Sequence, residues 1–126
     1  MKSKVKLEYL FPSVSASRLW DLVGTPIGLS DWFCDTCEVE DSIYHFEWQR
    51  NIERASCLKR SNGNVIRFKW EGDDSPVSYF EFKVMKNDLT TDVVLEITDF
   101  ASMNEEDECV ELWNTQVDVL KRVLGM

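Results

Sequence analysis

The segment C-D-T-C at residues 34–37 contains two cysteines whose spacing is found in reactive and metal-binding sites. Two thiols so spaced can form a redox dithiol or supply half of a tetrahedral zinc site. A zinc site needs two further ligands, but this spacing occurs once, and the remaining candidates are Cys57, Cys109 and the single histidine, His45. A redox motif opens a helix, where the dipole lowers the thiol pKa; this one follows a predicted helix. We expect reduced cysteines, no metal and no cofactor.

Acid–base chemistry requires an acid and a base that converge on one pocket with shifted pKa values. His45 alternates with the apolar residues of its predicted strand, so it is expected on the solvent side. Glu47 and Arg54 are expected there too, unless a β-bulge reverses the alternation and turns them inward. Asp99 occupies the same alternate positions as the apolar residues of its predicted strand, so it is expected to point inward. A buried carboxylate there needs a partner. The sequence contains no G-x-S-x-G, H-E-x-x-H or phosphate-binding glycine loop. These patterns predict that the protein is not an enzyme.

Composition narrows the function classes further. The chain has 126 residues, of which 44% are hydrophobic and 29% charged, as expected for one domain over residues 1–126. A net charge of −9 argues against nucleic acids and anionic membrane surfaces, which bind clustered Lys and Arg. No apolar run approaches the ~18 residues of a membrane span, and the basic amino-terminal segment has no apolar core typical of a secretory signal. We expect a cytoplasmic protein.

The elements that position these residues begin with a strand over 5–11, in which apolar and polar residues alternate. Ser13 or Ser15 is expected to cap a first helix that ends at Gly24. Thr25 is expected to cap a second helix that has Pro26 at its first position, where a missing amide hydrogen costs nothing. The sequence therefore predicts two short helices directly after the first strand.

From residue 36 to residue 100 the hydrophobic pattern has a period of two. Turn residues such as Asn87-Asp88 separate the segments, and connections this short predict an antiparallel meander. One face of the predicted sheet is apolar, whereas residues such as Glu81 belong to the solvent face. The predicted strands are 36–40, 43–48, 51–60, 64–71, 77–86 and 90–100.

The last predicted element is a long amphipathic helix over residues 104–124. Asn104, or Ser102 together with Glu105, is expected to cap it, and an acidic run at 105–108 suits the positive end of its dipole. A sheet with one apolar face must bury that face, and this helix is long enough to cover it. The sequence predicts an α+β helix-grip fold: a curved, antiparallel, seven-stranded sheet wrapped around the C-terminal helix, with the two short helices closing one end.

The order of elements and several segments resemble the START-like, or SRPBCC, superfamily, in the branch of the Hsp90 ATPase activator homologues. The chain is most similar to a bacterial START-like group found mainly in Bacteroidetes-type genomes. The resemblance covers residues 4–125. It rests on S-A-S-R-L-W-D-L-V-G-T-P-I-G-L-S-D-W-F, Y-H-F-E-W, V-I-R-F-K-W, S-Y-F-E-F-K-V, T-D-V-V-L-E-I-T-D-F-A and L-W-N-T-Q-V-D-V-L-K-R-V-L.

The resemblance implies a cavity between sheet and helix that binds a small apolar molecule. The aromatic rings that are expected to point inward would occupy the space of this cavity. An empty void of ~300 Å³ would cost about 7 kcal/mol of stability, so we expect a small or shallow pocket. The alternative is a protein-interaction module with a filled interior, acting through an acidic face and exposed rings at Trp32 and Phe33; a homodimer is a variant of it. The candidate cavity residues are Trp32, Phe33, Tyr44, Phe46, Trp48, Phe68, Trp70, Phe80, Phe82, Trp113, Val117 and Leu120.

Overall fold

The computed structural model describes residues 2–87, 89–90 and 92–126, and within them the chain forms three helices and seven strands. Asp88 of the predicted turn and Thr91 of the predicted strand 90–100 lie outside the described residues. The elements are β1 (Lys2–Phe11), α1 (Ala16–Val23), α2 (Pro26–Trp32), β2 (Thr36–Glu40), β3 (Ile43–Trp48), β4 (Asn51–Ser61), β5 (Val65–Trp70), β6 (Phe80–Lys86), β7 (Val93–Ser102) and α3 (Glu106–Val123).

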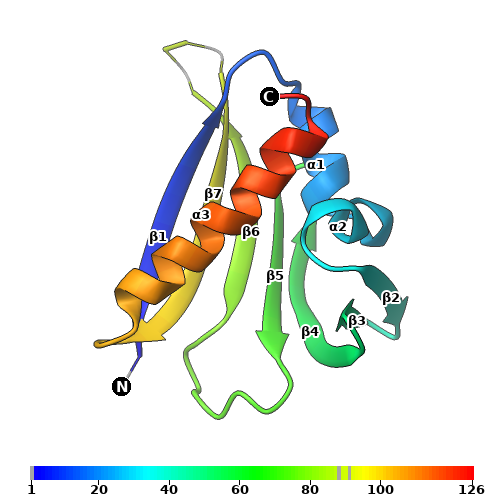
Figure 1. Ribbon diagram of the computed structural model, residues 1–126, viewed down its shortest axis with the longest axis vertical. Helices are drawn as coiled ribbons and strands as arrows, with labels where there is room; N and C mark the ends of the chain where they lie inside the picture. The colour runs from blue at the N-terminus through cyan, green and yellow to red at the C-terminus, as the bar shows by residue number, and fades with distance from the viewer. Residues whose placement is uncertain (1, 88, 91) are drawn as a thin grey trace.

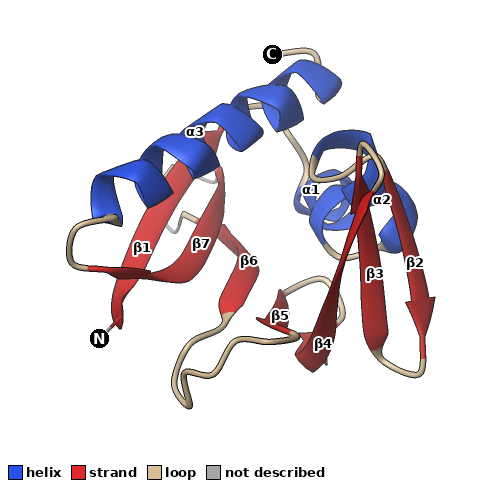
Figure 2. Ribbon diagram, turned by 60° about the horizontal axis from the view of Figure 1, so that its bottom comes forward, coloured by secondary structure: helices blue, strands red, loops and turns tan. Residues whose placement is uncertain are grey.

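All seven strands form one antiparallel sheet in the order β1-β7-β6-β5-β4-β3-β2. Strands that are neighbours in the sheet also follow each other in the sequence, with one exception. The exception is β1, which pairs with β7 and places Lys2 opposite Ser102 and Phe11 opposite Val93. The sheet is strongly curved, and all three helices lie on its concave side (Figures 1 and 2). Helix α3 crosses β1, β7 and β6, while α1 and α2 lie over the other half. The predicted helix-grip architecture is confirmed.

The space between sheet and helices is filled by aromatic rings. Phe46, Phe68, Phe80 and Phe82 alternate along β3, β5 and β6, and none is more than 1% exposed. Their ring centroids lie 5.6 Å apart for Phe46 and Phe68, 5.0 Å for Phe68 and Phe80, and 6.0 Å for Phe80 and Phe82. Full burial of one such side chain contributes roughly 1.5–3 kcal/mol. The deep interior is therefore hydrophobic core.

Helices α1 and α2 are capped and held together by side chains of their own. The Ser15 hydroxyl accepts a hydrogen bond from the backbone N–H of Arg18, and Thr25 Oγ1 accepts one from Gly28 N–H at 3.0 Å. Of the two serines predicted as caps, Ser15 has this role. Trp32 Nε1 donates to the carbonyl of Leu22 at 2.7 Å, which ties the end of α2 back to α1.

Helix α3 begins at Glu106, and the predicted side-chain cap at Ser102 or Asn104 is wrong. Its N-cap residue is Glu105, which makes no side-chain capping hydrogen bond. Ser102 is paired with Lys2 in the sheet, and its carbonyl accepts the Glu105 N–H in a turn at 2.8 Å, so the helix starts too late for either cap. The acidic first turn is present as predicted. No helix in the described part of the chain is long and apolar enough to cross a membrane.

The predicted strand 77–86 begins only at Phe80. Lys69 Nζ donates to the carbonyls of Ser75 and Ser78 at 2.6 and 2.9 Å, and the Ser78 hydroxyl donates to the Asp73 carboxylate. These bonds hold the β5–β6 loop in a compact shape, so its backbone does not continue the ladder. Exposed residues at the tip of this loop are of types that favour β-strands, but they do not pair with another strand.

The outer face of the sheet holds a charged side chain that is more buried than the alternation of polar and apolar residues predicts. Glu81 is 7% exposed, because Arg67 Nε donates to its carboxylate at 2.8 Å. The Arg67 guanidinium lies 4.0 Å from the ring centroid of Tyr79, which in turn contacts Phe100. Tyr79 therefore covers this ion pair, a tertiary contact that the alternation of residues does not reveal.

Candidate ligand-binding pocket

Most of the predicted cavity residues are packed in the core. Trp32, Tyr44, Phe46, Phe68, Phe80, Phe82, Val117 and Leu120 are at most 6% exposed, and none of them lines the main pocket. The other four predicted residues, Phe33, Trp48, Trp70 and Trp113, come together at one end of the sheet. The filled interior and a shallow opening agree with the expectation drawn from the number of rings.

The pocket has a volume of about 410 Å³ and opens where β7 ends and β1 begins. The first three turns of α3 form one side, and the ends of β3, β5 and β7 form the other. Its floor is apolar and its rim is polar. The lining residues are Lys2, Phe33, Trp48, Trp70, Asp99, Phe100, Ala101, Ser102, Glu105, Glu108, Cys109, Leu112, Trp113 and Gln116.

Four rings, Phe33, Trp48, Trp70 and Trp113, form what we call the aromatic wall. Phe33 and Trp113 are nearly parallel, with centroids 6.0 Å apart and an interplanar angle of 9°. Trp48 meets Phe33 edge to face at 5.3 Å and lies 6.2 Å from Trp70. Trp48 Nε1 donates to the Phe33 carbonyl at 2.7 Å. Because these contacts fix the rings, the wall is present before any ligand arrives.

Asp99 is the polar group beside this wall, and it points inward as its strand parity predicts. One carboxylate oxygen accepts from Trp113 Nε1 at 2.8 Å and from the Cys109 thiol at 3.6 Å. The other oxygen accepts from the Phe100 backbone N–H at 2.8 Å. Burial raises the pKa of Asp99, and the hydrogen bond from Trp113 counteracts part of this effect.

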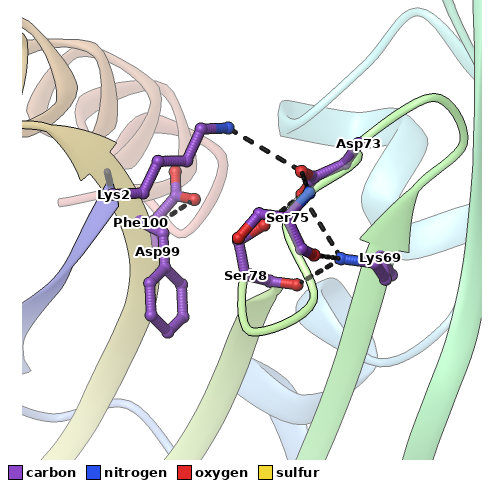
Figure 3. A network of polar contacts seen from close by, with 7 residues as sticks. All are labelled: Lys2, Lys69, Asp73, Ser75, Ser78, Asp99 and Phe100. Carbon is purple, nitrogen blue, oxygen red and sulfur yellow. Dashed lines mark hydrogen bonds and ion pairs between the residues drawn. The ribbon is translucent and has the colours of Figure 1, made fainter.

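Lys2 spans the mouth of the pocket. Its ammonium reaches from β1 to Asp73 in the β5–β6 loop, with 3.9 Å between Nζ and Oδ1, as Figure 3 shows. Asp73 also lies 3.6 Å from Lys69 Nζ. The hydrogen bond from Ser78 is the main cause of the lowered pKa of Asp73. The loop and the first strand are thus joined at the rim, above Asp99.

The buried position of Asp99 predicts a pH-dependent effect of substitution. A raised pKa means that the folded state binds a proton more readily than the unfolded state does, so the ionised carboxylate lowers stability at neutral pH and this penalty disappears on acidification. The unfolding free energy of Asp99→Asn minus that of the wild type should therefore be more positive at pH 7 than at pH 4. Urea denaturation at both pH values measures this difference. A difference that stays constant would contradict the prediction.

The cysteine pair follows the end of α2, and Cys34 comes directly after Phe33 of the aromatic wall. Cys34 is buried and Cys37 is half-buried. A hydrogen bond with the Cys34 side chain lowers the pKa of Cys37, and the same contact together with burial raises the pKa of Cys34. No group of three or more His, Cys, Asp or Glu side chains within the described residues could hold a metal ion.

Two other predicted candidates stay apart from the pocket. His45 and Arg54 are directly opposite each other on β3 and β4 and line a separate hollow of about 370 Å³ together with acidic residues. The register shift in β4 lies beyond Arg54, between Cys57 and Lys59, so it leaves the orientation of Arg54 unchanged.

The interaction surface expected at Trp32 and Phe33 is wrong. These side chains are 6% and 3% exposed, because Trp32 packs edge-on against Phe82 and Phe33 against Phe46. The apolar side of α2 faces the core rather than a partner. The exposed residues of α2 are Ile27 and Asp31.

Sequence reasoning missed several pocket residues, among them Lys2, Phe100, Cys109 and Gln116. The sequence did carry a signal for Cys109 and Gln116, because they recur with Trp113 at helical spacing and lie on one stripe of α3. Lys2 and Phe100 carry no such signal, because only the pairing of β1 with β7 brings them to this end of the sheet.

Comparisons with known proteins agree with this architecture. The family model of the START-like superfamily domain matches residues 1–126. The solution structure of BfR322 from Bacteroides fragilis is 40% identical, with a TM-score of 0.70, and the match covers 99% of this chain and 93% of that one. A comparison with curated proteins found no match.

Two more distant structures share the fold. The Aha1 dimer from Colwellia psychrerythraea is 12% identical, with a TM-score of 0.75 over 94% of this chain and 93% of that one. CalU16 from Micromonospora echinospora is 16% identical, with a TM-score of 0.67 over 94% of this chain and 71% of that one. At these identities the likeness concerns the fold alone.

Proposed function

The chain belongs to the START-like superfamily, and from this membership we propose that it binds a small apolar molecule in the open pocket beside Trp113. The observation that carries the proposal is the aromatic wall, which lines a volume of about 410 Å³. That volume lies within the range of roughly 300–1,000 Å³ typical of small-molecule sites. The deep interior offers no comparable room, because its phenylalanines are in mutual contact.

The composition of the pocket supports a ring-containing ligand. Flat aromatic molecules stack on Trp and Phe rings at centroid distances of roughly 4.5–7 Å. The wall offers two such rings to a ligand, Trp48 and Trp70, and they are backed by the buried Phe33 and Trp113. Trp48 and Trp70 are only half-buried, so part of each ring surface is free to meet a ligand.

We propose binding without catalysis. The nearest nucleophile–carboxylate pair in the pocket is Cys109 with Asp99. Burial and the neighbouring Asp99 raise the pKa of Cys109 to about 11. The thiol is therefore protonated at neutral pH and is a poor nucleophile. The four free thiols support a reducing compartment, and we assign the protein to the cytoplasm on that basis.

The proposal is tested by titrating the protein with N-phenyl-1-naphthylamine, a neutral apolar probe whose fluorescence rises on binding. Gln116→Trp adds a ring to the pocket, and we expect it to weaken probe binding at least tenfold. Thr115→Trp adds the same ring one residue away on the exposed side of α3, outside this pocket, and should leave binding unchanged. Absence of binding to the wild type, or equal binding to both variants, would refute the proposal.

A further inference from the structure

The geometry of the pocket points to a more specific ligand. We infer that the bound molecule carries a positively charged ammonium group, which pairs with Asp99 in front of the aromatic wall. This inference rests on the proposed function and adds the charge of the ligand to it.

Among the described residues, Asp99 has hydrogen-bond donors but no cation within ion-pair distance, and the charge of Lys2 acts on it only from farther away. Its three partners are the Trp113 indole, the Cys109 thiol and the Phe100 backbone N–H, all of them neutral. None of the ion pairs among the described residues includes it. An ionised carboxylate offers about four lone-pair sites, so Asp99 keeps capacity for a further donor on the pocket side.

Among the residues that the structure describes, one cation lines the pocket, and it is already engaged. Lys2 Nζ lies 3.9 Å from Asp73 Oδ1, across the mouth, so its charge is shared with a carboxylate outside the pocket (Figure 3). The other ionisable carboxylates in the lining are Glu105, the N-cap residue of α3, and Glu108 in its first turn. The electrostatic field at the pocket therefore favours a cation and opposes an anion.

The aromatic wall supplies the second half of the recognition. Indole faces are electron-rich, and they attract ammonium groups by about 0.5–2 kcal/mol, depending on desolvation. Trp48, Trp70 and Trp113 line the same space as Asp99, and Trp113 is hydrogen-bonded directly to it. A carboxylate held against indole rings suits a ligand whose aromatic part stacks while its ammonium group faces Asp99.

Three naphthalenes of nearly equal size test the inference: 1-naphthylmethylammonium, 1-naphthylmethanol and 1-naphthoate, each titrated into the full chain by calorimetry at 0.15 M salt. We expect the ammonium compound to bind about tenfold more tightly than the alcohol, and the naphthoate to bind most weakly. Binding of the alcohol reports on the apolar pocket, whereas the advantage of the ammonium compound reports on its charge preference.

The substitution Asp99→Asn should remove the tenfold advantage of the ammonium compound over the alcohol when both are titrated into the same variant. Glu111→Gln removes one charge from an exposed position of α3 outside this pocket and should preserve the advantage. Equal affinity for ammonium and alcohol in the wild type would overturn the inference and leave the proposed function intact, whatever the stability of the variants. An advantage retained in Asp99→Asn would also overturn it, and failure of all three compounds would overturn both proposals.

Discussion

Replacing Trp113 with alanine is expected to lower the free energy of unfolding by about 3–5 kcal/mol, as the loss of a large buried aromatic side chain does. Trp113 is 7% exposed and contacts Phe33, Phe80 and Phe82, with centroids 6.0, 6.4 and 5.6 Å away. Like Val117 and Leu120, it anchors α3 in the core, and in addition it lines the pocket. Its removal leaves a cavity and deprives Asp99 of its indole donor.

Two companion variants separate these contributions. Trp113→Phe keeps most of the ring volume but removes the N–H, so it should cost less than the alanine change. Leu112→Ala alters the adjacent, 67% exposed residue of the same helix and should change stability by no more than about 0.5 kcal/mol. Chemical denaturation measures all three. If Trp113→Ala behaves like Leu112→Ala, the core position assigned to Trp113 is incorrect.

The second large effect is expected at Gly28, where α2 touches the end of α1. A Cβ atom at this position would lie 1.8 Å from the carbonyl oxygen of Asp21 and 2.6 Å from Cα of Leu22. Both are backbone atoms, so the two helices would have to move apart. We expect Gly28→Ala to destabilise the protein by about 3 kcal/mol, the upper part of the usual range for overpacking.

Ile27→Ala provides the matched control, because it places the same residue on the same helix at a site that is 81% exposed. Its thermal unfolding should stay close to that of the wild type, while Gly28→Ala should unfold at a clearly lower temperature. Equal melting temperatures for Gly28→Ala and the wild type would show that α1 and α2 are not packed this closely.

The fold was predictable from sequence because its signals are local and repeated. Alternation over Tyr44, Phe46 and Trp48 indicates a half-buried strand, and Thr25-Pro26 indicates the start of a helix; both predictions agree with the structure. The errors fall where a distant partner determines the backbone. Lys69 holds the β5–β6 loop out of the ladder, and the pairing of Ser102 with Lys2 delays the start of α3.

The pocket was less predictable than the fold for a related reason. Phe33, Trp48 and Trp70 stand at the ends of three different elements, and the sequence marks them only as apolar residues among many others. Which rings remain partly accessible depends on the curvature of the sheet and the position of α3. Asp99 was recognisable as an inward carboxylate, but its partner Trp113 became evident only from the docked helix.

The pairing of β1 with β7 has a consequence for biosynthesis. Residue 2 is opposite residue 102, so the strand β1 has no neighbour until residue 102 has been translated. At ~5–20 residues per second a ribosome needs about 5–20 s to make that stretch. Throughout this interval β1 lacks the strand with which its backbone hydrogen-bonds in the folded protein.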